Sequence, residues 1–244
     1  MRSLARRSAR INIAVMRHRR LIWGQKRCKR IERRGVRKPV LVIACGALAR
    51  EIDALKKSYG WEHLHMQCID ARLHLRPALI PDRLRAKIQE NKGKYEQIFV
   101  AYADCGTTGG IDRVIEEEGV ERLPGAHCYQ FFAGPEQFAE MSDAEPGTFY
   151  LTDFLAQHFD RLVVRPLKLD SHPELRDAYF GNYRRLIYLS QRIDEDLLRA
   201  AKVAADRLML EFEHVHCGYG ELETSLRMQL EGRNGGQENN HLLA

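Results

Sequence analysis

The sequence lacks any apolar run long enough to cross a bilayer. Its longest continuous candidates, residues 40–45 and 98–102, fall far short of the roughly 18 to 20 residues that a spanning helix needs. It also lacks the apolar core of about 7 to 15 residues that is typical of a secretory signal peptide. We therefore expect a protein without membrane contact, located in the cytoplasm.

A second absence concerns the spacing of the cysteines. Six are present, at positions 28, 45, 68, 105, 128 and 217, and no two of them form a CxxC pair. The CxxC spacing would by itself indicate a zinc or redox motif. In a chain without a signal peptide, these cysteines are expected to be reduced thiols, metal ligands or core residues, not a disulfide framework.

A third absence is acidic charge at the start of the chain. Residues 1–38 hold 15 Lys and Arg against the single acid Glu32, a net charge of +14, whereas the remaining 24 basic and 32 acidic residues sum to −8. The body therefore offers no broad cationic face to a nucleic acid, and we expect no nucleic-acid partner. Residues 1–38 are predicted to be a disordered extension: a non-native tail from an upstream start codon, a basic arm for RNA or anionic lipid, or a targeting peptide.

Short apolar runs alternate with helical patterns after this extension. Strands are predicted at 40–44, 61–69, 97–102 and 121–123, and helices at 47–58, 78–90 and 111–118. Further helices are predicted at 131–141, 148–159, 174–188 and 194–208, with a late strand at 210–215. This order predicts an α/β, Rossmann-like fold: a mainly parallel sheet with flanking helices, and a helical C-terminal half closed by the late strand. We assign residues 39–230 to one domain and 231–244 to a disordered tail.

Three cysteines follow predicted strands. Cys45 ends the first strand, Cys105 lies three residues past the third, and Cys128 lies in the loop after the short fourth. Because ligands bind at the carboxyl ends of parallel strands, these thiols are expected to meet in one pocket and to bind a metal. The competing interpretation is that each cysteine packs as a small hydrophobe.

The nature of the metal depends on the fourth ligand. Three thiolates and an open position suit a catalytic zinc ion, and an iron–sulfur cluster with one non-cysteine ligand is the alternative. His74 is the candidate fourth metal ligand, with a loop hydrogen bond as its competing role, and His127 is a second candidate.

A glycine-rich turn follows the third strand, before a predicted helix. It contains Asp104 and then Gly106, Thr107, Thr108, Gly109 and Gly110. Successive backbone N–H groups of this kind can hold a phosphate or carboxylate, so these five residues are candidates for binding an anionic group of a substrate. The turn matches neither a P-loop nor a dinucleotide fingerprint.

Acid–base chemistry has three candidate residues. Asp104 and His127 flank the proposed thiol pocket in sequence, and Asp153 stands in a polar stretch further along the chain. A carboxylate or imidazole beside a metal can transfer protons to and from a substrate.

Several motifs together resemble the bacterial and archaeal family called domain of unknown function 1638. They span roughly Pro39 to Leu226 and comprise Ala44-Cys45-Gly46, Tyr102-Ala103-Asp104-Cys105-Gly106-Thr107, Gly125-Ala126-His127-Cys128-Tyr129, Gly147-Thr148-Phe149-Tyr150-Leu151-Thr152-Asp153-Phe154-Leu155 and Gly218-Tyr219-Gly220. The resemblance implies a link to corrinoid-dependent methyltransferases that act on methylated amines. The segment from Ala71 to Pro77 departs from the family pattern, which is richer in Pro and Asn there.

Three functional hypotheses follow. The first is a thiolate-ligated, metal-dependent enzyme or accessory factor of one-carbon and methylamine metabolism, a methyltransferase or related transferase acting on a small-molecule substrate with a corrinoid protein as partner. The second is a non-catalytic binding or chaperone module for a corrinoid or metal partner, and the third is a metal-free protein that binds a small anion. The sequence leaves homo-oligomer formation open.

Overall fold

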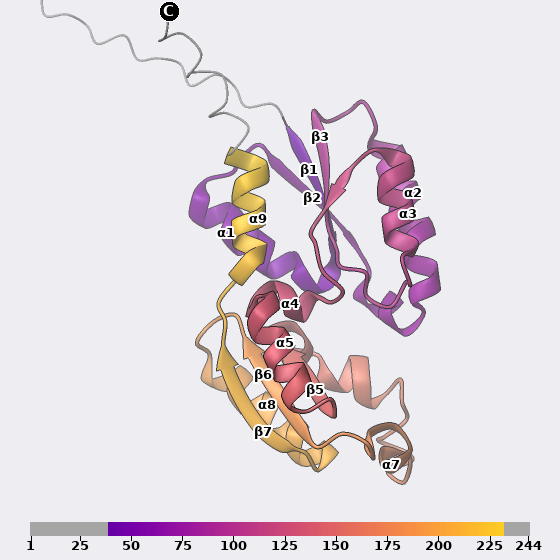
Figure 1. Cartoon of the computed structure of the whole chain (residues 1–244), viewed down its shortest axis with the longest axis vertical. Helices are drawn as coiled ribbons and strands as arrows, with labels where there is room; N and C mark the ends of the chain where they lie inside the picture. The colour runs from indigo at the N-terminus through magenta and orange to yellow at the C-terminus, as the bar shows by residue number, and fades with distance from the viewer. Residues whose placement is uncertain (1–38, 232–244) are drawn as a thin grey trace, which may run out of the picture. The chain divides into compact units, whose positions relative to one another are not determined.

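The computed structural model describes residues 39–231 (Figure 1). All of them lie in one compact unit. The predictions for residues 1–38, including Cys28, and for residues 232–244 concern segments outside the described residues. None of the helices between residues 39 and 231 is long and apolar enough to cross a membrane.

The first parallel sheet has the strand order β2-β1-β3-β4. Its strands are β1 (Val40–Cys45), β2 (Leu64–Ile69), β3 (Gln97–Ala101) and β4 (Glu121–Arg122). In the register, Val42 of β1 lies between Met66 and Phe99. Every residue of β1 is buried, as its uninterrupted apolar run predicts for a central strand.

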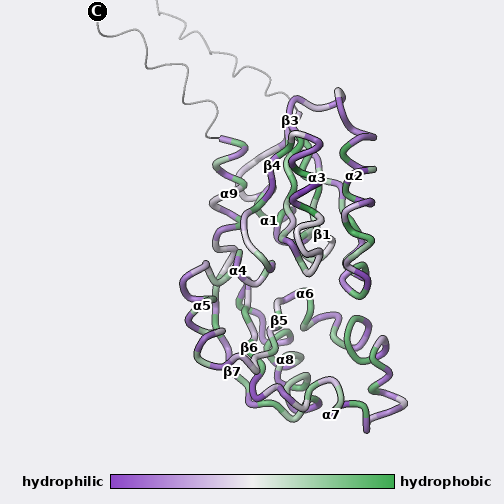
Figure 2. Tube along the Cα trace, turned by 45° about the vertical axis from the view of Figure 1, so that its right-hand side comes forward, coloured by the Kyte–Doolittle hydropathy of each residue, from purple (hydrophilic) through white to green (hydrophobic). Residues whose placement is uncertain are grey.

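Helices cover both faces of this sheet. α1 (Ala49–Tyr59) and α9 (Gly220–Glu231) lie on one face, and α2 (Ile80–Asn91) and α3 (Gly110–Glu118) on the other (Figure 1). Each follows the amphipathic pattern of a covering helix, and Figure 2 shows hydrophobic and hydrophilic residues alternating around α2. The 3₁₀ turns η1 (Gly46–Leu48), η2 (Ala71–Leu75) and η3 (Pro77–Leu79) complete the crossovers.

A second parallel sheet has the order β5-β6-β7. It is built from β5 (Thr148–Thr152), β6 (Arg185–Ser190) and β7 (Glu211–His216). α8 (Glu195–Leu208) packs on one face, while α4 (Cys128–Ala133) and α5 (Pro135–Ala144) contribute to a cluster on the other. The remaining elements are α6 (Asp153–Gln157), the π-helix η4 (Asp160–Val164) and α7 (Leu175–Phe180).

The predicted α/β class, with parallel strands and flanking helices, is confirmed, and so is the late strand. Two predicted helices are wrong. The segment 148–159 begins with strand β5 before α6, and the segment 174–188 contains α7 and then most of strand β6. Short apolar runs of this length do not distinguish a buried strand from a helix by periodicity, and the second sheet was missed for that reason.

The last helix returns to the first sheet. Leu222, Leu226 and Leu230 recur every four residues on α9, and all three belong to the core of the first sheet. The indole N–H of Trp61 donates a 2.9 Å hydrogen bond to Glu231 at the end of the same helix. The first core is therefore completed by a segment that follows the second sheet in the chain.

Candidate functional site

The three predicted metal-binding cysteines come from three separate loops at the carboxyl edge of the first sheet. Cys45 ends β1 and is buried, with its sulfur accepting a 3.3 Å hydrogen bond from the backbone N–H of Ala47. Cys105 follows β3, and Cys128 is the first residue of α4. All three belong to, or pack against, the core of the first sheet.

The thiols lie near enough to influence one another. Burial is the main cause that raises the pKa of Cys105 to about 12, and proximity to Cys45 adds to it. Burial is also the main cause that raises the pKa of Cys128, and the neighbouring Cys105 and Cys45 raise it further. The backbone N–H of Cys128 lowers the pKa of Cys105, so the loops that carry these two residues are in contact.

Cys45 has a similar environment. Burial raises the pKa of its thiol to about 11, against the opposing hydrogen bond from Ala47. None of the largest influences on the pKa values of the three thiols is a Lys or Arg side chain.

Tyr102 lies among these thiols. Its side chain is fully buried, and its hydroxyl has no hydrogen-bond partner of good geometry. It lies close enough to the thiol of Cys45 to lower that thiol's pKa, and burial, Cys45 and Cys105 raise the pKa of the hydroxyl. A thiol is a weak hydrogen-bond partner, so this hydroxyl is poorly satisfied.

The backbone at Cys105 is unusual. Its φ of 49° lies in the left-handed region, which a residue with a side chain rarely adopts. The backbone N–H of Cys105 donates to Ala126 at 2.9 Å and holds the loop in place. Strained backbone of this kind persists where the surroundings fix it, often at binding sites.

His74, the candidate fourth ligand, lies beside the same residues. Its ring stacks on Tyr102 with centroids 5.9 Å apart, and its Nδ1 lies 2.8 Å from the carbonyl oxygen of Ala71. Because a carbonyl only accepts, Nδ1 carries the hydrogen and leaves Nε2 as an acceptor in the neutral ring. Burial by surrounding protein lowers the pKa of His74.

The predicted metal ligands are thus neighbours, but they do not form a ready-made coordination shell. Among residues 39–231, no group of three or more His, Cys, Asp or Glu side chains is arranged to hold a metal ion. Binding a metal would require the side chains to draw together. The assignment of Cys45, Cys105, Cys128 and His74 as ligands stays a prediction.

The glycine-rich turn is filled by a side chain of its own, the carboxylate of Asp104. The carboxylate of Asp104 accepts hydrogen bonds from the Thr107 hydroxyl at 2.6 Å, from Gly109 N at 2.9 Å and from Thr108 N at 3.2 Å. Burial opposes ionisation of Asp104, but these bonds outweigh it, and its pKa lies below the usual value. The carboxylate lies where an external anion was predicted.

Two further N–H groups at the end of the turn are also engaged. Gly110 N donates to the Thr107 carbonyl at 3.0 Å, and Ile111 N contacts the Thr107 hydroxyl at 3.3 Å. Gly106 lies in the left-handed region, with φ of 80°. A substrate anion would have to displace Asp104 from the turn. The anion site and a catalytic role for Asp104 stay predictions.

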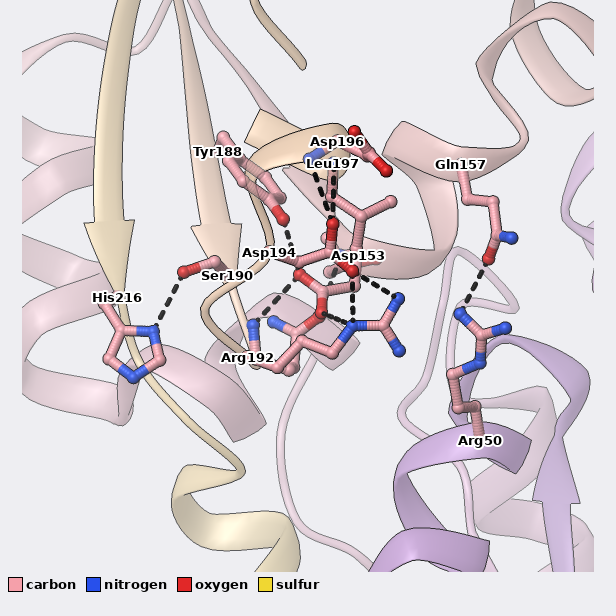
Figure 3. A network of polar contacts seen from close by, with 12 residues as sticks. Arg50, Asp153, Gln157, Tyr188, Ser190, Arg192, Asp194, Asp196, Leu197 and His216 are labelled. Atoms are coloured by element: carbon pink, nitrogen blue, oxygen red, sulfur yellow. Dashed lines mark hydrogen bonds and ion pairs between the residues drawn. The ribbon is translucent and has the colours of Figure 1, made fainter. Parts of the chain in front are cut away.

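The other two candidate acid–base residues lie in different surroundings. His127 is exposed and precedes Cys128, with its ring 6.4 Å from that of Tyr129. Asp153 is buried at the carboxyl end of β5, where it accepts a hydrogen bond from the Tyr188 hydroxyl at 2.7 Å (Figure 3). It also accepts one from Gln191 N at 3.1 Å. The guanidinium of Arg192 lies 3.7 Å from it. Catalytic roles for both stay predictions.

A serine between two imidazoles was not predicted. Ser190, buried at the end of β6, contacts Nδ1 of His216 at 3.0 Å (Figure 3). It also contacts Nε2 of His214 at 2.9 Å. The two histidines alternate with Val215, so they share one face of strand β7. The alternation of the two histidines is visible in the sequence, but their contact with Ser190 is not.

Comparisons with known proteins give a family but no activity. A family model described as "Protein of unknown function (DUF1638)" matches residues 68–226. No curated protein matches the sequence. Among solved structures, ornithine carbamoyltransferase from Pyrococcus furiosus is similar with a TM-score of 0.25 and 16% identity, over 73% of this chain and 54% of that one. The chain spans about half the length of that enzyme, and so distant a likeness carries no argument about function.

Proposed function

The chain belongs to the family called domain of unknown function 1638, and we propose that it binds a thiophilic metal ion through Cys45, Cys105 and Cys128. It would act as a metal-dependent enzyme or accessory factor. Zinc is the first candidate metal and an iron–sulfur cluster the alternative, with His74 as the candidate fourth ligand. The resemblance drawn from the sequence motifs extends the proposal to cytoplasmic one-carbon metabolism, with a corrinoid protein or methyltransferase as partner.

One observation carries the proposal: three thiols from three loops lie near enough to Tyr102 and to one another to shift each other's pKa values, and the backbone of Cys105 donates to Ala126, two residues before Cys128. Core packing would explain one buried cysteine, but it gives less reason for three of them to meet at the carboxyl edge of one sheet. A metal ion would supply positive charge there and would favour the thiolate forms.

The chemistry of such a site follows from its ligands. A zinc ion held by three thiolates keeps one position for a substrate and can activate a bound thiol or polarise a bound oxygen. The protein's own contribution is the Cys105 loop, which is held by the hydrogen bond to Ala126 and limits the movement of one ligand.

Elemental analysis of protein purified without oxygen tests the proposal. We expect about one zinc per chain, or iron with acid-labile sulfide if a cluster is bound. The metal content of Cys105→Ser should be at least tenfold lower than that of the wild type, because a hydroxyl is a poor ligand for a thiophilic ion. The metal-loaded protein is then assayed for methyl transfer with a purified corrinoid protein, which separates an enzyme from an accessory module.

Two variants provide controls. Cys217→Ser alters a half-buried thiol whose raised pKa, about 11, is due to burial alone. Cys28→Ser removes the thiol that lies outside the described residues. Both should retain the metal. Metal-free wild-type protein, or equal metal in Cys105→Ser and the controls, would contradict the proposal.

A further inference from the structure

A cavity of about 210 Å³ adjoins the thiol pocket. It lies at the carboxyl ends of strands from both sheets, where loops after β1 and β2 face β5 and α6. Its walls include two residues of the candidate metal site, Cys128 and His74. The other lining residues are Ala47, Ala71, Arg72, Leu75, Tyr129, Phe149, Thr152, Phe154, Leu155, Leu162 and Val163.

The size of the cavity restricts its occupant. An apolar protein cavity of about 150 Å³ is large enough to hold benzene. The present cavity therefore accommodates a substituted six-membered ring or a branched chain of similar bulk. Nucleotides and corrinoid rings are too large to enter it.

The charge of the lining restricts the occupant further. No Asp, Glu or Lys lines the cavity, so a cation would find no counter-charge there. Arg72 is the one cationic residue, and its guanidinium donates two hydrogen bonds to Asp70, at 2.9 and 2.6 Å. An anion would have to compete with that carboxylate, and its desolvation in the apolar cavity would be unfavourable.

The polar part of the wall is confined to a few atoms. The ring of His74 is held by the Ala71 carbonyl, which leaves its Nε2 as an acceptor. Cys128 is also a lining residue, as are the polar residues Arg72, Tyr129 and Thr152, and the remainder of the lining is mostly aliphatic and aromatic carbon. A ligand with an apolar body and one hydroxyl or thiol group would match both regions.

We infer that this cavity binds the substrate, and that the substrate is a small uncharged molecule with a ring-sized apolar body and one hydroxyl or thiol group directed toward His74 and Cys128. The role as substrate rests on the proposed function, because it places the polar group beside the metal ligands. The binding chemistry of the cavity itself requires no metal.

Three probes of equal ring size test the inference on metal-free, full-length protein. Benzyl alcohol is uncharged, benzylammonium is cationic and benzoate is anionic. Ligand-observed NMR titrations should give at least tenfold tighter binding for benzyl alcohol than for either ion. Equal binding of all three, tighter binding of an ion, or no binding of benzyl alcohol would overturn the inference.

Matched tryptophan variants locate the binding. Leu155→Trp fills the cavity and should abolish benzyl alcohol binding, whereas Leu198→Trp, on α8 outside the cavity, should leave it unchanged. Circular dichroism verifies that both variants are folded. Undiminished binding in a folded Leu155→Trp would contradict this location.

Failure of this inference is distinguishable from failure of the proposed function. Cys105→Ser should lose metal and keep benzyl alcohol binding, while Leu155→Trp should keep metal and lose the alcohol. In metal-loaded protein, phenylmethanethiol should bind more tightly than benzyl alcohol if its sulfur reaches the metal, and equal affinity would place the occupant away from the ligands.

Discussion

At the level of single residues, the buried carboxyl group of Glu51 on α1 destabilises the fold. Its side chain is 3% exposed, and its Oε2 makes no hydrogen bond. Burial raises its pKa to about 7, with a further contribution from Asp153. Asp153, by contrast, accepts hydrogen bonds from Tyr188 and Gln191. Of these two buried carboxyl groups, it has the more complete set of hydrogen bonds.

Stability should therefore fall with rising pH because of Glu51. Its pKa in the folded protein lies above the ordinary 4.5, so the folded state binds the proton more tightly between these values. The resulting penalty is absent at low pH and complete above pH 7, where it amounts to roughly 3 kcal/mol. Between pH 5 and 8, urea unfolding should show wild type losing about 2 to 3 kcal/mol relative to Glu51→Gln.

Leu55→Ala on the same helix is the control for this measurement. It removes buried carbon but no titratable group, and it should be destabilising by about 2 to 5 kcal/mol at both pH values. A difference between wild type and Glu51→Gln that is independent of pH would contradict the assignment. Glu51 precedes Ile52 and follows Leu48 by three residues, so helical periodicity places it at the edge of the buried face, but its burial was not predicted.

At the level of elements, the first sheet was largely predictable and the second was not. β1 and β3 are uninterrupted apolar runs followed by amphipathic helices, which is the sequence pattern of parallel βαβ units. β6 has the same kind of run, from Leu186 to Leu189, and the turn dipeptide Gly181-Asn182 separates it from α7. The predicted helix 174–188 ran through this turn signal, and the strand pairs with β5 and β7.

The start of α9 depends on a close backbone approach. Gly220 has φ of +49°, and a Cβ there would lie 2.4 Å from the carbonyl oxygen of Phe132 and 2.5 Å from that of Phe131. Gly220→Ala therefore combines backbone strain with a clash against α4. We expect a loss of about 3 kcal/mol or more in the free energy of unfolding, measured with urea.

Gly119 offers a matched comparison. It also has a positive φ, +66°, but no atom lies within 4 Å of the position of a Cβ. Gly119→Ala should be destabilising by about 1 to 2 kcal/mol, from backbone strain alone. If the two variants were equally stable, the contact between α4 and α9 would not restrict the backbone at Gly220.

At the level of the whole molecule, the sequence predicted which loops meet but not how they are filled. The convergence of Cys45, Cys105 and Cys128 followed from the rule that parallel strands share a carboxyl edge. The surroundings of the Tyr102 hydroxyl and the closure of the glycine turn by Asp104 did not follow from this rule. They depend on side-chain directions that long-range packing fixes. A motif can identify backbone N–H groups, but it does not reveal that a neighbouring carboxylate occupies them.

The two sheets should unfold together, because α9 follows the second sheet and completes the core of the first. Leu208→Ala removes a fully buried side chain of α8 from the core of the second sheet and should be destabilising by about 2 to 5 kcal/mol. In a Trp23→Phe background, fluorescence of Trp61 reports on the first sheet. Its urea midpoint should shift by as much as that of circular dichroism, whereas an unchanged Trp61 midpoint would indicate independent unfolding.

The position of α9 also affects the protein while the ribosome is making it. β4 ends at Arg122 and α9 begins at Gly220, so close to 100 residues are added between the last strand of the first sheet and the helix that covers it. At about 5 to 20 residues per second, translation leaves that apolar face uncovered for roughly 5 to 20 seconds. During this interval the nascent chain is a natural client for a chaperone that shields exposed hydrophobic surface.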